Sequence, residues 1–95
     1  MSACFIVEVE VTDPVAYESY KPLAGASVEK YGGRFKVRGG KAELIEGTGQ
    51  PKRVVVLEFD DLAAAKRWYN SPEYQEALAI RQRASKSRVI LVEGA

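Results

Sequence analysis

The 95-residue sequence contains no histidine and only one cysteine, Cys4. The lack of histidine excludes histidine-based catalytic dyads and triads, histidine metal sites and histidine haem ligation. A single cysteine excludes an intrachain disulfide and the cysteine spacings of metal sites, and it indicates a reducing, cytoplasmic compartment. We therefore expect no cofactor and no metal, and any proton chemistry depends on Asp, Glu, Tyr, Lys or Cys4.

The chain also lacks a long apolar run, and its net charge is only +1. No segment approaches the roughly 18 apolar residues of a membrane-spanning helix. The N-terminus, MSACFIVEVEV, has no basic region and is interrupted by glutamates, so it predicts a strand and not a signal peptide. Because the small net charge gives no electrostatic argument for them, we expect neither nucleic acid nor membrane partners. The hydrophobic fraction of 46% is typical of one globular domain, here residues 1–95.

Two glycine pairs organise the middle of the chain, in the stretch Tyr31–Gly40 with the sequence YGGRFKVRGG. The first pair, Gly32 and Gly33, stands where a preceding helix must end, because glycine adopts the left-handed conformation needed there without a Cβ clash. The second pair, Gly39 and Gly40, supplies the positive-φ positions of a tight turn. The alternating run between the pairs, Arg34–Arg38, predicts a strand.

Apolar periodicity and capping signals predict the remaining elements. Asp13 followed by Pro14 is typical of a helix start. Pro22 lies inside this helix, where a proline removes a hydrogen bond, so we expect a kink or a break near Lys21. The other expected elements are strands Cys4–Val11, Arg34–Arg38, Arg53–Phe59 and Arg88–Glu93, a helix after Asp61 through Asn70, a helix starting at Pro72, and a hairpin extension at Lys41–Glu46.

This order predicts an α+β fold, the ferredoxin-like β-α-β-β-α-β sandwich, with both helical segments on one face of a four-stranded antiparallel sheet. Helices on one face leave apolar residues uncovered on the other, and we expect these to be Ile6, Val54, Val56, Val89 and Leu91. Exposed apolar patches usually mark association surfaces, and a symmetric partner would cover this one. The sequence therefore predicts a homodimer in which two open sheet faces meet.

Strict alternation places charged residues on the same open face. Glu58 follows the parity of Val56, and Arg38 lies opposite Phe35 and Val37, which we expect to face the helices. Buried charges must pair or shift their pKa values. Two interpretations stay open. One is a structural Arg38–Glu58 salt bridge that sets the register of the dimer; the other is the polar end of an apolar pocket, with Arg38 binding a carboxylate or enolate and Glu58 as base.

Aromatic residues on the predicted helices are candidates for the walls of such a pocket. Core packing is the simplest role for each of them. Trp68 and Tyr69 are better candidates, because the break between two helices at Asn70-Ser71-Pro72 can open a cleft. The candidate ligand-binding residues are therefore Arg38, Trp68, Tyr69, Tyr74, Tyr17 and Arg81, and the candidate catalytic residue is Glu58.

Several segments together resemble the small bacterial family called domain of unknown function 1330, of the dimeric α+β barrel superfamily. They are VEVTDPVAYESY, YGGRFKVRGG, EFDDLAAAKRWYNSPEY and the terminal VEG, and the joint spacing of GGRF, RGG and SPEY is specific. The resemblance covers nearly the whole chain, apart from Pro22, which departs from the family's helix sequence. It implies a ferredoxin-like protomer and a face-to-face dimer but no activity. Related superfamily members include cofactor-free monooxygenases, lactone isomerases, haem-degrading enzymes and stress-responsive barrel proteins.

The sequence thus predicts a cytoplasmic homodimer that binds a small organic anion or aromatic metabolite between sheet and helices. Arg38 is the expected anion clamp, Glu58 its partner, and Trp68, Tyr69 and Tyr74 the walls. Two alternatives stay open: a cofactor-independent isomerase or monooxygenase with Glu58 as base, and a structural or interaction dimer without a ligand site. A cavity would distinguish them, because a filled interface packs at interior density.

Overall fold

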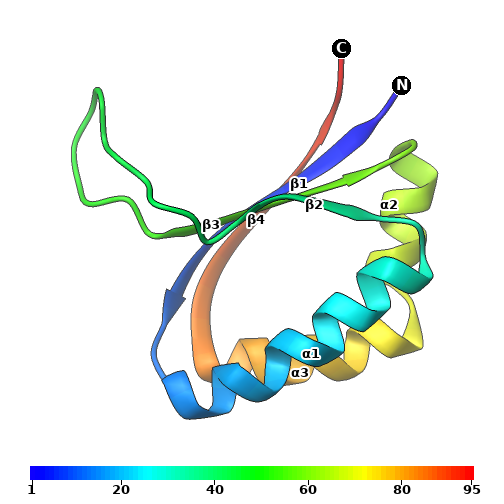
Figure 1. Cartoon of the computed structure of the whole chain (residues 1–95), viewed down its shortest axis with the longest axis horizontal. Coiled ribbons are helices and arrows are strands. Elements are labelled where there is room, and N and C mark those ends of the chain that lie inside the picture. The colour runs from blue at the N-terminus through cyan, green and yellow to red at the C-terminus, as the bar shows by residue number, and fades with distance from the viewer.

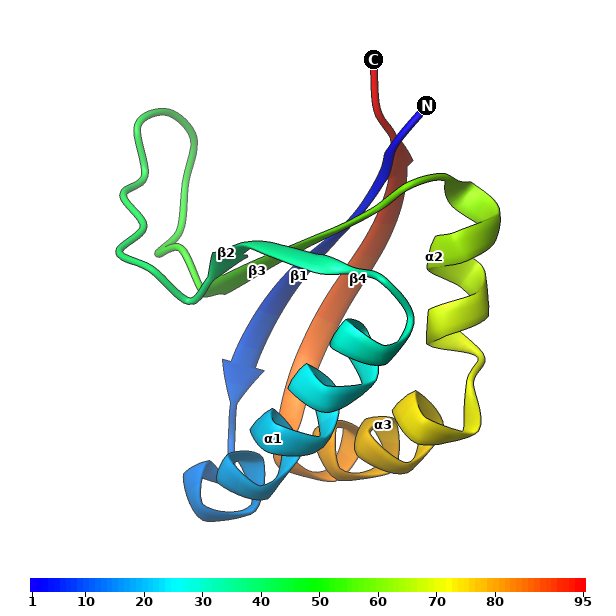
Figure 2. The same ribbon diagram turned by 45° about the vertical axis from the view of Figure 1, so that its right-hand side comes forward.

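The computed structural model describes all 95 residues. Four strands form one antiparallel sheet in the order β2-β3-β1-β4. The helices pack on one face of this sheet and leave the other face uncovered (Figures 1 and 2). In chain order the elements are β1 (Ala3–Val11), α1 (Pro14–Lys30), β2 (Arg34–Arg38), β3 (Arg53–Phe59), α2 (Leu62–Tyr69), α3 (Pro72–Ala84) and β4 (Ser85–Glu93).

The predicted ferredoxin-like α+β fold is confirmed, with the second helical segment in two pieces. The bounds of β2 and β3 are those predicted, whereas β4 begins at Ser85 because α3 passes directly into it. The side chains of Asp13, Asp61 and Ser71 cap the three helices as N-caps. None of the helices is long and apolar enough to span a membrane.

The core between sheet and helices is aromatic. Phe5 and Phe59 of the sheet pack against Trp68 of α2, which lies 4.1 Å from Tyr74 of α3, measured between ring centroids. The Trp68 indole N–H donates to Ser27 Oγ at 3.0 Å, so this buried polar group is satisfied. The break between α2 and α3 thus places two aromatic side chains under the centre of the sheet.

We predicted a kink or a break near Lys21, and the break is wrong, because helix α1 continues unbroken through Pro22. A proline inside a helix removes the hydrogen bond that its own nitrogen would donate, and its ring crowds the carbonyl four residues earlier. Pro22 is exposed to solvent, while Tyr17 and Ala24 on the buried side anchor the helix on both sides of it.

The predicted hairpin extension at Lys41–Glu46 is also wrong, because these residues belong to an exposed loop that extends beyond the sheet (Figure 1). The chain leaves β2 at Gly39, which has a φ of 72° and donates its N–H to the Val54 carbonyl at 2.9 Å. No strand pairing follows until β3 begins at Arg53. The loop residue Ile45 is one of the most exposed apolar side chains in the molecule.

Strand β2 contains an irregularity at Lys36, where the register against β3 shifts by one residue. Before this β-bulge, Phe35 packs against the core, as predicted. After the bulge, Val37 is 40% exposed on the open face, and Arg38 pairs with Val55 and faces the helices. Strict alternation predicted the reverse for both residues and is wrong here, because a bulge re-aims the side chains that follow it.

The open face differs from the prediction in β4 as well. Ile90 and Val92 lie on it, because they pair with Ile6 and Cys4 of β1, whereas Val89 and Leu91 pack against the core. The prediction that Val89 and Leu91 lie on the open face was therefore wrong, because alternate residues of β4 point to opposite faces and these two face the helices. The apolar open-face patch consists of Cys4, Ile6, Val37, Val54, Val56, Ile90 and Val92.

Glu73, near the start of α3, joins this helix to the end of α1. Its carboxylate accepts a hydrogen bond from Lys30 Nζ and another from Tyr31 Oη at 2.8 Å. The bond from Lys30 is the largest cause that lowers the pKa of Glu73 from 4.5 to about 2. A carboxylate with a depressed pKa in the folded state stabilises that state above its unfolded-state pKa, and the contribution is lost as the pH falls.

We therefore expect Glu73→Gln to lower the free energy of unfolding at neutral pH, and the difference to disappear as the pH falls below the folded-state pKa of about 2. Urea unfolding of parent and variant across this pH range would measure the difference. Glu76→Gln is the control, because Glu76 is exposed on the same helix and its side chain forms no ion pair. A pH-independent difference for Glu73→Gln would contradict this expectation.

Candidate functional site

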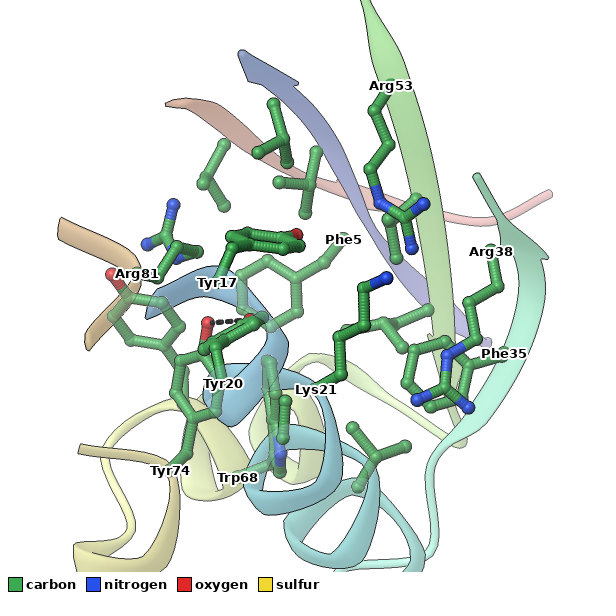
Figure 3. A pocket seen from close by; sticks show the side chains of 18 residues that line it. Phe5, Tyr17, Tyr20, Lys21, Phe35, Arg38, Arg53, Trp68, Tyr74 and Arg81 are labelled. Atoms are coloured by element: carbon green, nitrogen blue, oxygen red, sulfur yellow. Dashed lines mark hydrogen bonds between the residues drawn. The ribbon is translucent and has the colours of Figure 1, made fainter. Parts of the chain in front are cut away.

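A pocket opens between the sheet and the helices, beside the aromatic core (Figure 3). Its empty volume is about 580 Å³ with the open mouth included, and its enclosed part is narrow. Of its 18 lining residues, 14 are hydrophobic. The other lining residues are all cationic, and none is acidic: Lys21, Arg38, Arg53 and Arg81.

The structure brings all the predicted ligand-binding residues together in the lining of this pocket. They come from α1, β2, α2 and α3 and are separated widely in the sequence. Their roles in binding remain predictions. These residues are Tyr17, Arg38, Trp68, Tyr69, Tyr74 and Arg81.

Glu58, the predicted base, does not line the pocket. It lies on the open face of β3, where its carboxylate pairs with Arg34 at 3.1 Å, and Arg34 also reaches Asp60 at 3.5 Å. The predicted Arg38–Glu58 pair is wrong, because the bulge turns Arg38 to the opposite face of the sheet. The structure therefore separates the candidate base from the candidate anion clamp.

Arg81 of α3 lies at the inner end of the pocket and is only 5% exposed. Its Nε has no hydrogen-bond partner, and no carboxylate forms an ion pair with its guanidinium group. Burying a cation without a counter-ion is unfavourable, and most buried arginines are paired. The charge of Arg81 therefore has no structural explanation within the chain.

Two tyrosine hydroxyl groups lie beside Arg81 (Figure 3). Tyr20 Oη and Tyr74 Oη are 2.9 Å apart and share one hydrogen bond. Burial raises the pKa of both phenols, and for Tyr74 the charge of Arg81 partly opposes this increase. Both hydroxyl groups are therefore protonated at neutral pH, and one of their two hydrogens remains free to donate to a ligand.

The other cationic side chains lie toward the opposite end of the pocket (Figure 3). The guanidinium carbon of Arg38 lies 4.1 Å from the centroid of the Phe35 ring, a cation–π distance. The Nε of Arg53 is buried without a hydrogen-bond partner. Lys21 is the exception among the cations, because it pairs with exposed Glu18 at 3.1 Å. The outer end thus contains two arginines without ion pairs.

Two glycines leave room for these arginine side chains. A Cβ atom on Gly25 of α1 would lie 3.2 Å from Nη2 of Arg38. A Cβ atom on Gly39 would lie 2.0 Å from Nη1 of Arg53, and the φ of 72° at Gly39 also disfavours other residues. Glycine at these two positions therefore leaves the space that the guanidinium groups of Arg38 and Arg53 occupy.

Three further residues that were not among the predicted site residues also line the pocket: Tyr20, Lys21 and Arg53. Strand alternation contained a signal for Arg53, because it shares the parity of Val55, which faces the helices. Helical spacing contained a signal for the other two, which follow Tyr17 by three and four positions. Nowhere does the structure gather three or more His, Cys, Asp or Glu side chains in the way a metal site requires.

Fold and pocket together define a ferredoxin-like α+β protein with a cation-rich, aromatic pocket between sheet and helices. The sequence matches the family described as Domain of unknown function (DUF1330) over residues 2–95, so the chain belongs to this family. The predicted resemblance is confirmed. No curated protein matches the sequence significantly.

Solved structures with the same fold include proteins of known and unknown function. A protein of unknown function from Rhodopseudomonas palustris is 22% identical, with a TM-score of 0.80 over 99% of this chain and 82% of that one. SnoaB, a cofactor-independent oxygenase from Streptomyces nogalater, is 17% identical, with a TM-score of 0.70 over 99% and 93%. A dimeric ferredoxin-like protein of unknown function from Jannaschia sp. CCS1 is 14% identical, with a TM-score of 0.75 over 99% and 100%. Identities this low establish a shared fold only.

Proposed function

We propose that this protein binds a small organic anion with a flat, apolar body in the pocket between sheet and helices. The observation that supports this function is the charge of the lining, which contains four cationic side chains and no acidic one. A carboxylate or phenolate would offset that charge and accept charge-assisted hydrogen bonds from guanidinium groups. The aromatic walls and the narrow enclosed space favour a planar ring over a bulky group.

The structural alternative, a dimer without a ligand site, accounts less well for these observations. A structural buried arginine is normally paired with a carboxylate of the chain. Arg81 is buried and has no such ion pair. A pocket is also present where this alternative requires a filled interior. A ligand anion would explain both features.

Titration with benzoate tests the proposal, because Trp68 is the only tryptophan and lines the pocket. We expect benzoate to change the tryptophan fluorescence and to raise the melting temperature. Benzamide has a similar shape without the charge and is expected to bind at least about tenfold more weakly. Isothermal titration calorimetry would measure both affinities directly.

In the same assay, Arg38→Gln is expected to weaken benzoate binding by roughly tenfold, about 1.4 kcal/mol, because it removes one charged donor at the mouth. Arg67→Gln is the matched control, because Arg67 is exposed on α2 and does not line the pocket. Equal affinity of the parent for benzoate and benzamide would contradict the proposed function. Unchanged affinity in Arg38→Gln would remove Arg38 from the anion clamp.

We also propose that two copies of the chain associate through the open-face patch. This patch is apolar at its centre and uncovered in the single chain, and exposed patches of this kind mark association surfaces. Ion pairs surround it, including Arg88 with Glu8 at 3.6 Å and Lys52 with Glu10 at 2.7 Å. The dimeric description of the Jannaschia protein supports this proposal.

The Ile6→Arg variant is expected to be monomeric at concentrations where the parent is dimeric. Ile6 lies between Val56 and Ile90 on the neighbouring strands, so a charge there would be buried at the centre of the interface. We expect the dimer dissociation constant to rise at least about hundredfold, measured by light scattering. Val15→Arg is the control, because Val15 is an exposed apolar residue of α1, away from the sheet. A monomeric parent would contradict the proposed dimer.

A second candidate function is catalytic, a cofactor-independent oxygenase or isomerase that acts on the bound anion. The backbone similarity to the oxygenase SnoaB favours it, and cations in an apolar site stabilise enolate or phenolate anions. Glu58 is not suited as base in this pocket, because it lies on the opposite face of the sheet with Arg34. Oxygen consumption with phenolic substrates, absent in Arg81→Met, would support this candidate. If none of these substrates is turned over, ligand binding stays the proposed function.

A further inference from the structure

We infer that the pocket recognises a ligand with two anionic groups, one at each end of a flat apolar body. This inference rests on the proposed function and goes beyond it by defining the class of ligand. The class is a short planar dianion, such as an aromatic dicarboxylate. The unpaired cations lie at two separate ends of the pocket and are not gathered at one point.

The inner end is built to hold one anionic group. Arg81 is nine-tenths or more buried, and its Nε lacks a hydrogen-bond partner. Beside it, the Tyr20–Tyr74 pair has one hydroxyl hydrogen that their mutual bond does not use. A guanidinium group and a free phenol hydrogen together match the two oxygens of a carboxylate. No acidic residue of the chain occupies this position.

The outer end holds a second, separate set of donors. Arg38 belongs to β2 and Arg53 to the start of β3, at one side of the sheet, and neither forms an ion pair. Arg81 belongs to the last turn of α3, which runs directly into β4 at the other edge. Edge strands β2 and β4 of this sheet are three strand spacings apart, about 14 Å. Figure 3 shows Arg81 and Arg38 on opposite sides of the pocket.

Aromatic side chains separate the two ends. Phe5 and Tyr17 lie between Arg81 and Arg38 (Figure 3), and the centroid of the Tyr17 ring is 6.0 Å from the guanidinium carbon of Arg53. The indole N–H of Trp68, which also lines the pocket, is already bonded to Ser27. A single carboxylate is too small to reach guanidinium groups at both ends. One monoanion would therefore leave one end uncompensated, whereas a planar dianion would satisfy both ends and place its ring against the aromatic walls.

Terephthalate and a longer naphthalene dicarboxylate, each compared with its own monomethyl ester, test this inference by calorimetry. The ester keeps the body and removes one charge. We expect at least one of the dicarboxylates to bind the parent about tenfold or more tightly than its ester, because each charge-assisted end contributes roughly that factor. This ratio of dicarboxylate affinity to ester affinity is expected to fall below about threefold in Arg81→Met. The double variant that combines Arg38→Gln with Arg53→Gln is expected to show the same fall.

Arg83→Met is the control, because Arg83 is exposed on the same helix and is expected to keep the parental preference. The double variant changes the outer end alone, so the test does not depend on the folding of Arg81→Met. If both dicarboxylates bind no more tightly than their esters, or if the preference persists in the double variant, the two-ended site is overturned while the proposed function stands. If the parent binds none of these anions or benzoate, both are overturned.

Discussion

The Arg81→Met variant is expected to be more stable than the parent without ligand and to lose most of its affinity for aromatic dicarboxylates. Methionine keeps the apolar stem of the side chain and removes a buried charge that has no counter-ion. Removing a buried group with an unsatisfied donor is expected to raise the free energy of unfolding by about 1–3 kcal/mol. Losing a charge-assisted bond to the ligand is expected to weaken binding by roughly 10- to 100-fold.

Urea unfolding of the ligand-free protein and calorimetry with the dicarboxylate that the parent binds more tightly would measure the two effects separately. Arg83→Met is again the control, and as an exposed substitution it should change the free energy of unfolding by less than about 0.5 kcal/mol. Opposite changes in stability and affinity would identify Arg81 as a residue kept for binding. If Arg81→Met instead destabilises the protein by several kcal/mol, the arginine has a structural role. This result would contradict the proposal that its unpaired charge is kept for ligand binding.

Gly33→Ala is expected to destabilise the fold by about 1–3 kcal/mol, although it adds a single methyl group. A Cβ atom at this position would lie 2.6 Å from Cζ of Phe59 and 2.9 Å from Cγ1 of Val28. Both neighbours are fully buried, so neither can move away without disturbing the core. Chemical unfolding monitored by circular dichroism would measure the loss, which is a large fraction of the stability of a domain of this size.

Gly40→Ala is the matched control, because a Cβ atom there would have no neighbour within 4 Å and its φ is not positive. We expect its free energy of unfolding to stay within about 0.5 kcal/mol of the parent. Similar losses in both variants would indicate a general effect of replacing glycine, and would contradict the specific contact with Phe59. The pair thus separates close packing from backbone conformation as the reason for glycine in this stretch.

Local signals in the sequence were sufficient for the elements and their order. Asp13 and Asp61 are followed by helices that begin as predicted, because a cap is made by residues a few positions apart: the N–H of Ala16 bonds to Asp13 and that of Ala64 to Asp61. The bounds of β2 and β3 also follow from local alternation and from flanking glycines or charges. These contacts form between near neighbours in the chain, so a single sequence is enough to predict them.

Gly32 and Gly33, at the end of α1, have different roles, and neighbouring residues in the sequence predict only one of them. Gly32 has a φ of 77°, as expected for a residue that ends a helix. Gly33 has no positive φ, and its lack of a side chain is needed for close contact with Phe59, which comes 26 positions later in the chain. Neighbouring residues predicted the first role, whereas the second depends on which strand packs over the end of α1.

The tertiary structure alone decided which charged residues meet. The sequence identified Arg38, Arg81 and the aromatic walls as candidates, and they line one pocket. It paired Arg38 with Glu58 because strict alternation places both on one face. The bulge at Lys36 breaks that alternation, and its position depends on the hydrogen-bond register between β2 and β3, which a loop of exposed residues joins. Register is a property of two strands together, so periodicity within one strand determines its bounds but cannot determine which face its charges reach.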